Sequence, residues 1–150
     1  MDAKNINALV KKLPNFGGIF DASQLDKVKI LGLPVSLIVN ANEHWLGIYL
    51  DSENMEIMDS LGELQNSMKN KELCRFVCAH LLGKKFVSTP QLQSNSSSDC
   101  GMYAVSFLWY RSFTESSLIK FSEIFDQNFE YNSEKISEIF KTVKAINESS

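Results

Sequence analysis

The stretch from Cys100 to Phe113 limits the possible folds of this chain more than any other segment, because it is apolar on nearly all sides. An amphipathic helix can lie at a surface, whereas a helix that is apolar all round has to be buried. The chain has 150 residues, which corresponds to one domain, and we expect residues 1–150 to form it. The segment 100–113 therefore predicts a helix in the middle of that domain.

Hydrophobic periodicity predicts the elements around this helix. Short apolar or β-branched runs indicate strands, and apolar residues three or four apart indicate helices. The expected strands are 35–39, 45–50, 55–58 and 86–88, with a hairpin turn at 51–54 and a loop at 16–30; the expected helices are 5–12, 64–82, 100–113, 117–129 and 133–146. We therefore expect an α+β fold in which a small mixed sheet is packed by helices.

Cys100 is the first candidate for chemistry, because it follows a flexible polar loop and opens the apolar helix. A thiol at a helix N-terminus meets the positive end of the helix dipole and unpaired backbone N–H groups, which stabilise a thiolate. Such placement can lower the pKa of a cysteine from about 8.5 to roughly 3.5–7.5. Gly101 leaves room for a substrate backbone to approach. The alternative role for Cys100 is that of a small buried core residue.

A thiolate nucleophile needs a base, and the chain contains two histidines. His44 begins a predicted strand, whereas His80 lies on a predicted helix, where a packed or surface histidine is the more ordinary role. If residues 51–54 form the hairpin loop, alternation along the two strands makes Asp59 the diagonal neighbour of His44 on one face of the sheet. Asp59 can then orient the imidazole, although a plain turn residue is its alternative role.

Gln93 is the candidate oxyanion donor. It lies seven positions before Cys100, and the Ser/Asn loop between them can fold back to bring the Gln93 amide beside the thiolate. The amide can then stabilise a tetrahedral intermediate together with a backbone N–H near Cys100. Gln91 lies two residues earlier on the same strand face and is a competing candidate.

Charge and cysteine content exclude several classes of protein. Net charge is −3, from 15 basic and 18 acidic residues, so we expect no nucleic-acid partner. No apolar run reaches the length of a membrane span and no signal peptide is visible, so we expect neither a membrane protein nor a secreted one. Cys74, Cys78 and His80 lack a fourth ligand and turn-like spacing. We therefore expect the two cysteines to pack in the core, and we expect no metal and no cofactor.

Four short motifs occur in the order His, Asp, Gln, Cys: His44-Trp45, Asp59-Ser60-Leu61-Gly62, Gln93 and Asp99-Cys100-Gly101. This order resembles the adenovirus-protease and SUMO-protease superfamily of cysteine peptidases, whereas papain-like enzymes place the cysteine first. Upstream, residues 6–13, 16–20 and 38–40 are similar to the adenovirus protease and its relatives from virophages and Polinton (Maverick) elements. The resemblance covers residues 5 to 113.

The resemblance implies a fold and a set of roles. The implied fold places the nucleophile at the N-terminus of a buried central helix. Trp45 would line a narrow groove, since both branches favour glycine at the cleavage site; a core aromatic is its alternative role. The implied catalytic residues are the nucleophile Cys100, the general base His44, the orienting residue Asp59 and the oxyanion-hole residue Gln93, and the substrate-binding residues are Trp45 and Gly101.

The adenovirus enzyme is activated by a short viral peptide through a disulfide, and by DNA. We expect neither mode here. The predicted strand and its continuation, residues 86–93, contain no cysteine, and only short pairs such as Lys11-Lys12 and Lys84-Lys85 concentrate positive charge.

These expectations combine into a thiol endopeptidase that cleaves viral or virus-like capsid or core precursor proteins at glycine-containing sites during particle maturation. Its partners would be those structural precursors, and it would be a monomer. It would be located in the virion, or in the cytoplasm or virus factory of the host cell. One alternative is a deubiquitinating or SUMO-removing isopeptidase, which uses the same chemistry. The other is a non-catalytic interaction module on the same fold.

Overall fold

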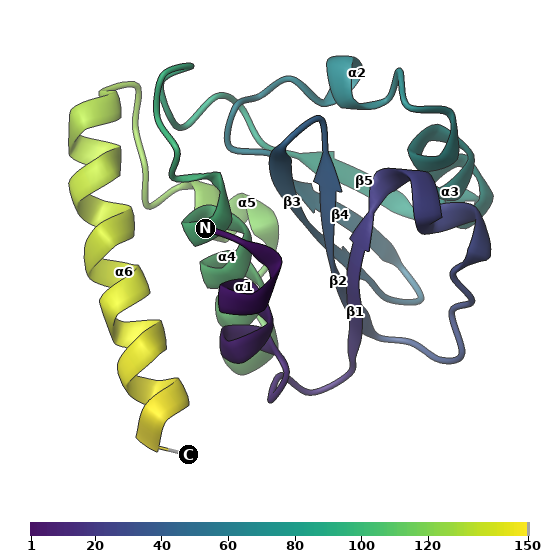
Figure 1. Ribbon diagram of the computed structural model, residues 1–150, viewed down its shortest axis with the longest axis horizontal. Helices are drawn as coiled ribbons and strands as arrows, with labels where there is room; N and C mark the ends of the chain where they lie inside the picture. The colour runs from purple at the N-terminus through teal and green to yellow at the C-terminus, as the bar shows by residue number, and fades with distance from the viewer. Residues whose placement is uncertain (150) are drawn as a thin grey trace.

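Within residues 1–149, which the computed structural model describes, the backbone forms one five-stranded mixed sheet with helices on both faces (Figure 1). The order of the strands across the sheet is the order of the sequence, and only the two outer pairs, β1/β2 and β4/β5, are parallel. The strands are β1 (Phe16–Asp21), β2 (Val35–Ala41), β3 (His44–Leu50), β4 (Asn54–Met58) and β5 (Lys85–Ser88). This arrangement confirms the predicted α+β class.

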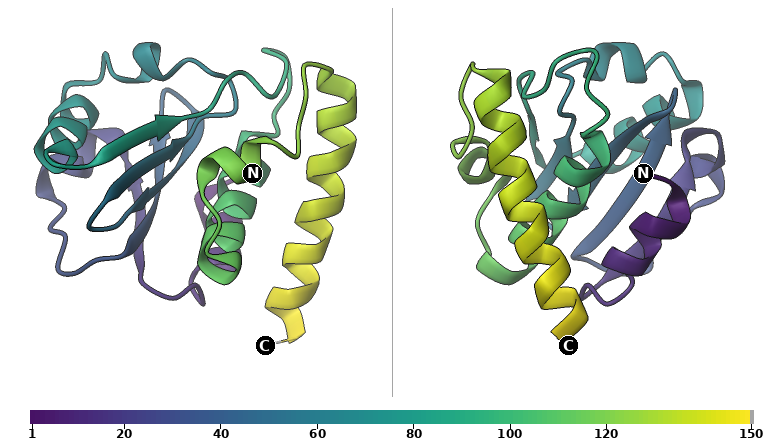
Figure 2. Two further views of the ribbon diagram at one scale, coloured as in Figure 1. Left: turned by 180° about the vertical axis from the view of Figure 1, so that it is seen from behind. Right: turned by 60° about the vertical axis from the view of Figure 1, so that its left-hand side comes forward.

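The helices divide between the two faces of the sheet. Figure 1 shows α4, α1 and α5 on one face, with α6 as an outer layer beyond α4, and it shows α3 and the 3₁₀ helix η1 on the other. The view from behind in Figure 2 shows the same separation. Their bounds are α1 (Ala3–Val10), η1 (Ala22–Lys27), α2 (Leu64–Ser67), α3 (Lys71–Leu81), α4 (Cys100–Thr114), α5 (Leu118–Ser122) and α6 (Phe129–Ser149).

Helix α4 is the centre of the larger core, as its all-round apolar character predicts. Its residues Tyr103 to Trp109 are buried, and the surrounding apolar side chains come from α1, α5, α6 and the sheet. Gly47 on β3 lets this helix approach the sheet closely, since a Cβ there would lie 3.1 Å from the carbonyl oxygen of Ala104. The close approach matters because α4 begins with Cys100 and β3 begins with His44.

The turn between β2 and β3 determines where β3 begins. Asn42 and Glu43 both have positive φ angles, 54° and 64°, and Ala41 pairs with His44 on the other side of the turn. Two central residues with positive φ are typical of a tight type I′ hairpin, whose twist matches that of the strands. His44 is therefore the first residue of a strand, as predicted.

The prediction of a loop over residues 16–30 was wrong for residues 16–27, while residues 28–30 belong to no helix or strand. Residues 16–21 form β1, which pairs in parallel with β2, and residues 22–27 form η1. The side chains of Asp21 and Gln24 cap η1 reciprocally. Local periodicity could not reveal β1, because a parallel strand gains its hydrogen bonds from a partner distant in sequence.

Two predicted helices were too long. The helix expected at 64–82 is divided into α2 and α3, because the side chain of Asn70 accepts a hydrogen bond from the backbone N–H of Leu73 and starts a new helix. The helix expected at 117–129 stops after α5. Beyond it, the backbone N–H and C=O of Asp126 both bond to the side chain of the buried Asn132.

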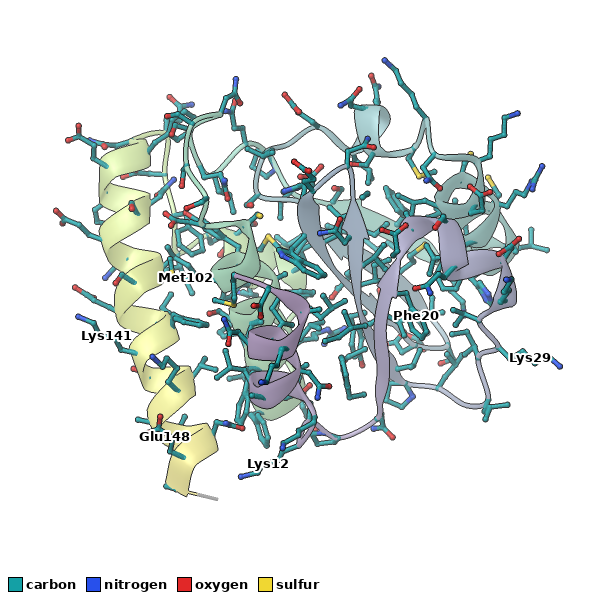
Figure 3. The ribbon with its side chains drawn as sticks, in the orientation of Figure 1. Lys12, Phe20, Lys29, Met102, Lys141 and Glu148 are labelled. Carbon is teal, nitrogen blue, oxygen red and sulfur yellow. The ribbon has the colours of Figure 1, made fainter. Side chains whose placement is uncertain are left out.

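The charged side chains lie mainly on the outside of these layers. Lys29 and Lys141 point away from opposite sides of the molecule (Figure 3). Lys12 lies near the C-terminal end of α6, where its ammonium donates to the carbonyl oxygen of Asn147 at 3.1 Å. Within residues 1–149, no helix combines the length and the apolar character that crossing a membrane requires.

Candidate active site

His44 and Asp59 form a buried pair at one end of the sheet. Nε2 of His44 lies 2.6 Å from Oδ1 of Asp59, and the two residues are 7% and 0% exposed. His44 starts β3 and Asp59 directly follows β4, so the antiparallel pairing of these strands brings the two residues together. The hairpin register that sequence analysis assumed, with Leu50 opposite Met55, is the observed one.

The carboxylate of Asp59 is held in place by backbone groups. Oδ1 also accepts from the N–H of Leu61 at 3.2 Å, and Oδ2 accepts from the N–H of Glu63 at 2.9 Å. The hydroxyl of Thr89 bonds to both the N–H and the carbonyl oxygen of Asp59. These contacts leave the Asp59 side chain little freedom, which suits a residue that orients an imidazole.

Cys100 is the first residue of α4, and its thiol faces the start of β3. The backbone N–H of Trp45 donates to Sγ of Cys100 at 3.5 Å, so the residue next to His44 contacts the thiol directly. Cys100 is half-buried and is not in a disulfide. The structure therefore brings Cys100 together with the His44–Asp59 pair, which lies much earlier in the sequence.

The surroundings of Cys100 and His44 favour a thiolate beside an imidazolium. Burial alone would lower the pKa of His44, but hydrogen bonds and charge interactions with Asp59 and Cys100 outweigh it and raise that pKa to about 9. Burial would raise the pKa of Cys100, yet interactions with His44 and the backbone N–H groups of Trp45 and Gly101 lower it. Nδ1 of His44 is buried and has no fully formed hydrogen bond within the described residues. It is thus the ring nitrogen left to exchange a proton with the thiol.

Gln93 is buried, and both ends of its side-chain amide are hydrogen-bonded. Its Oε1 accepts from the hydroxyl of Ser60, and its Nε2 donates to the carbonyl oxygen of Ser97 at 3.0 Å. An amide nitrogen carries two hydrogens, so one remains for an oxyanion. Nε2 of Gln91, by contrast, donates both to the backbone carbonyl oxygen of Gln93 and to Oδ1 of Asn95. The oxyanion role of Gln93 stays a prediction, and the hydrogen-bond geometry favours it over Gln91.

Trp45 and Gly101 lie together beside Cys100. Trp45 is half-buried and Gly101 is buried. A Cβ placed on Gly101 would lie 3.6 Å from Cδ1 of the Trp45 ring, so the indole packs directly against the residue after the nucleophile. The two residues predicted to bind substrate are thus neighbours, and each is adjacent in sequence to His44 or Cys100.

The remaining histidine and cysteines lie elsewhere. His80 packs against the ring of Phe76 on α3, with 4.6 Å between ring centroids. Cys74 is half-buried and Cys78 is exposed on the same helix, so the prediction that both pack in the core was wrong. They occupy the side of α3 that turns away from the sheet, whereas Leu73, Phe76 and Val77 fill the core side. In the part of the chain that the structure describes, no cluster of three potential metal ligands occurs.

Sequence reasoning missed two residues that organise the site. Ser60 bonds to Gln93 through its hydroxyl, and its carbonyl oxygen accepts from the backbone N–H groups of Leu92 and Gln93. Thr89 bonds to Asp59, as described above. Both are small hydroxyl residues in ordinary turn-like sequences, so no pattern distinguishes them. The available signals were that Ser60 belongs to the Asp59-Ser60-Leu61-Gly62 motif and that Thr89 lies four residues before Gln93.

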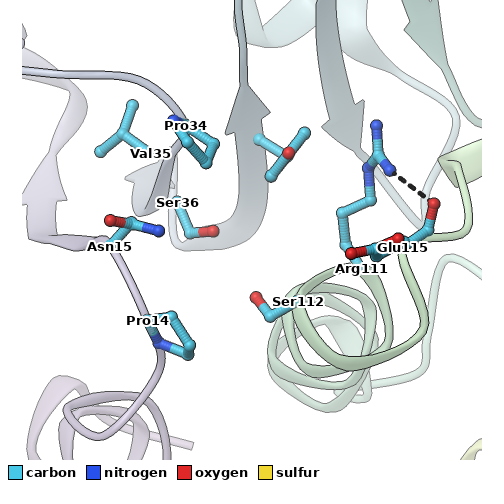
Figure 4. A pocket seen from close by; sticks show the side chains of 9 residues that line it. Pro14, Asn15, Pro34, Val35, Ser36, Arg111, Ser112 and Glu115 are labelled. Atoms are coloured by element: carbon cyan, nitrogen blue, oxygen red, sulfur yellow. Dashed lines mark hydrogen bonds between the residues drawn. The ribbon is translucent and has the colours of Figure 1, made fainter.

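A separate pocket of about 300 Å³ lies at the opposite end of α4 (Figure 4). Arg111 lines it, and eleven residues of helix place that residue roughly 16 Å along the axis from Cys100. Its guanidinium is already bound to Glu56 at 2.9 Å and to the carbonyl oxygen of Glu115 at 3.1 Å. Neither a thiol nor an imidazole is among the described residues that line this pocket, so we do not assign the chemistry to it.

Comparison with known proteins yields structural likenesses only, since no family model and no curated protein sequence matches the chain. A structure of SUMO protease Ulp1 with its catalytic cysteine oxidized to a sulfinic acid is 15% identical over 97% of this chain and 75% of its own, with a TM-score of 0.47. The structure of a de-sumoylating protease is 14% identical in sequence, and the match covers 98% of this chain and 78% of the protease, with a TM-score of 0.45. The structure of AvrA delL154 with IP6 and CoA is 12% identical in sequence, and the match covers 81% of this chain and 50% of AvrA, with a TM-score of 0.48.

Proposed function

We propose that this chain is a cysteine endopeptidase. The observation that supports the proposal is the convergence of Cys100, at the N-terminus of a buried helix, with the His44–Asp59 pair. A nucleophile with a lowered pKa, a base beside it and an acid that orients the base form the arrangement that acyl transfer by a thiol needs.

The chemistry has two halves. The Cys100 thiolate attacks the carbonyl carbon, a C–S bond forms, and the C–N bond breaks as the leaving amine takes a proton from the His44 imidazolium. His44 then removes a proton from water, the resulting hydroxide attacks the thioester, and the carboxylic acid leaves. This second half regenerates the thiolate and the imidazolium. The remaining hydrogen of the Gln93 amide and a backbone N–H near Cys100 would stabilise the oxyanion in both halves.

The finer part of the proposal concerns the substrate. We take it to be a viral or virus-like capsid or core precursor protein, cleaved at glycine-containing sites during particle maturation, with the enzyme a monomer in the virion or in the host cytoplasm or virus factory. The support is the resemblance of the His, Asp, Gln, Cys motifs and of the upstream segments to the adenovirus-protease group.

The first experiment is an intact-mass measurement after incubation with a Leu-Xaa-Gly-Gly vinyl ester probe. We expect a single adduct on the wild-type chain and none on Cys100→Ala. The matched control is Cys78→Ala, which removes an exposed thiol on α3 and should keep the adduct. Adduct formation that survives Cys100→Ala, or that disappears in Cys78→Ala, would contradict the assignment of the nucleophile.

The same experiment separates the alternatives. A chain that reacts with probes built on folded ubiquitin or SUMO much faster than with the short peptide would be an isopeptidase, because only a modifier-specific enzyme gains from the folded part. A chain that reacts with neither would be a latent enzyme that awaits an activator or an interaction module on this fold, and rescue of the reaction by partner proteins would distinguish the two. Cleavage of a candidate capsid precursor by the wild type, and not by Cys100→Ala, tests the proposed substrate class.

A further inference from the structure

The loop from Gln93 to Asp99, which leads into Cys100, faces a cavity on the side of α6. The cavity has a volume of about 420 Å³, and its lining includes Gln93 and Asp99 from the loop and Phe129 and Ser133 from α6. Figure 1 shows the start of α6 beside this loop. Because the loop faces a cavity here and not packed side chains, its placement depends on the hydrogen bonds at its two ends.

The peptide unit between Leu92 and Gln93 is held from both sides. The carbonyl oxygen of Leu92 accepts from Nδ2 of Asn132 on α6 at 2.9 Å. The N–H of Gln93 belongs to the same unit and donates to the carbonyl oxygen of Ser60 at 3.1 Å. A trans peptide unit is planar, with its C=O and N–H pointing in opposite directions, so the two bonds fix the orientation of the plane. That orientation sets the direction in which the Gln93 side chain leaves the backbone.

Asn132 is itself held rigidly, because it is 0% exposed and its amide is fully bonded. Oδ1 accepts from the N–H of Asp126 at 2.9 Å, and Nδ2 donates to the carbonyl oxygen of Asp126 at 2.8 Å as well as to that of Leu92. Carbonyl oxygens only accept, so the amide nitrogen has to face these two groups. The buried amide is therefore a fixed support between α6 and the beginning of the loop.

We propose that Asn132 is a positioning residue of the peptidase, which aims the amide of Gln93 at the oxyanion by holding the carbonyl of Leu92. It acts through the peptide unit and does not touch the reacting atoms. At the other end of the loop, the exposed hydroxyl of Ser133 donates to Oδ2 of Asp99 at 3.2 Å, so α6 contacts both ends. The inference rests on the proposed function and deepens it, since it gives the outermost helix a part in the chemistry.

The test is a double-mutant cycle between Asn132 and Gln93 in the full chain. The proteins are the wild type, Asn132→Ala, Gln93→Ala and the double variant, and kcat and KM are measured on a fluorogenic Leu-Xaa-Gly-Gly amide. Urea unfolding of each protein measures its stability separately. A loss of stability does not depend on Gln93, whereas a positioning effect disappears once no Gln93 amide remains to be aimed.

The matched control is Asn128→Ala. Asn128 is an exposed asparagine at the start of the same helix, where its Oδ1 accepts from the N–H of Tyr131 at 3.1 Å. Its removal weakens the start of α6 and leaves the bond between Asn132 and Leu92 in place.

We expect Asn132→Ala to lower kcat by about 10- to 100-fold with KM little changed, because a small displacement of a catalytic group can cost about 10²-fold. In the Gln93→Ala background the same substitution should lower kcat by less than about twofold. Asn128→Ala should keep kcat within about twofold of the wild type, since it shares no partner with Gln93.

An equal loss of kcat in both backgrounds would mean that Asn132 supports the fold and not Gln93, and an equal loss in Asn128→Ala would mean that any weakening of the helix start suffices. Should Asn132→Ala fail to fold, Asn132→Asp takes its place, because it keeps the acceptor for Asp126 and loses the donor for Leu92. Unfolding of both variants would assign Asn132 to the fold alone. Each of these results overturns the role of Asn132 and leaves the peptidase in place. A wild type that neither cleaves the peptide nor forms the vinyl ester adduct, with or without partner proteins, overturns the peptidase itself and the role of Asn132 with it.

Discussion

The pKa values of Cys100 and His44 are shifted from their ordinary values in opposite directions. The pKa of His44 rises to about 9, while that of Cys100 falls below the ordinary value for a thiol. At a pH between these two pKa values, the Cys100 thiol is deprotonated and the His44 imidazole is protonated. This is the protonation state that attack and leaving-group protonation both require.

We therefore expect turnover to have a bell-shaped dependence on pH. Turnover should rise with pH at values below about 8.5, the usual pKa of a thiol, because the lowered pKa of Cys100 lets the thiolate form at a lower pH. It should fall as pH passes about 9, because His44 then loses the proton that the leaving amine needs. In His44→Ala, the midpoint for alkylation of Cys100 by iodoacetamide should move up toward roughly 8.5. His80→Ala is the matched control, and an unshifted midpoint in His44→Ala would contradict the pairing.

Gln93 and Gln91 differ in how many of their amide hydrogens remain available. We expect Gln93→Ala to lower kcat by about 10²- to 10³-fold with KM little changed, as loss of one oxyanion donor does. Gln91→Ala should lower kcat much less, since both hydrogens of its amide are used within the loop. Steady-state kinetics on a peptide substrate measures both effects.

Ser60→Ala provides the control for this comparison. It removes the hydroxyl that bonds to Oε1 of Gln93 and leaves the Nε2 donor in place. If Gln93 acts mainly as a structural anchor, Ser60→Ala and Gln93→Ala should reduce kcat similarly. Normal kcat in Gln93→Ala would instead remove Gln93 from the oxyanion hole.

Helix α4 is joined to the sheet by a charged contact as well as by its apolar core. Nε of Arg111 lies 2.9 Å from Oε1 of Glu56 on β4, and the Glu56 side chain is 2% exposed. The guanidinium of Arg111 also stacks 4.2 Å from the ring centroid of Tyr49 on β3. Burial of Glu56 raises its pKa and the charge of Arg111 opposes that rise. The contact lies near the end of α4 opposite Cys100 and joins that end of the helix to β3 and β4.

Arg111→Leu should destabilise the protein by about 3–5 kcal/mol, because it leaves the Glu56 carboxylate buried without its partner. The double variant Arg111→Leu/Glu56→Leu should recover most of this loss, since an apolar pair of similar volume avoids the cost of a buried charge. Urea unfolding of the two variants and the wild type measures the free energies. A double variant as unstable as Arg111→Leu would show that the cost lies in lost packing and not in the uncompensated charge.

At the level of the whole molecule, the candidate site is assembled from the beginnings of two elements and the end of a third. His44 begins β3, Cys100 begins α4 and Asp59 follows β4. The close approach of α4 to β3 at Gly47 brings the three together, and α6 holds the loop before Cys100 through Asn132. The larger core around α4 thus sets the distance between nucleophile and base.

Several parts of this arrangement could be read from the sequence because they depend on local patterns. An all-round apolar segment that starts at Cys100 requires a buried helix with the thiol at its N-terminus. Alternation along two strands joined by a short turn is enough to bring Asp59 to His44, because the register of a hairpin follows from its loop. Both inferences need only neighbours in the chain, and both agree with the structure.

Other parts depended on contacts between residues far apart in the chain, which leave no periodicity in the sequence. β1 was missed because its partner strand lies about twenty residues away, and the helix at 64–82 divided because one side chain, Asn70, capped a new start. The anchoring of Gln93 by Ser60, and the bond from Asn132 to Leu92, exist only once the layers have packed. Local patterns therefore determined the candidate nucleophile, base and acid, while tertiary packing decided which neighbours surround them.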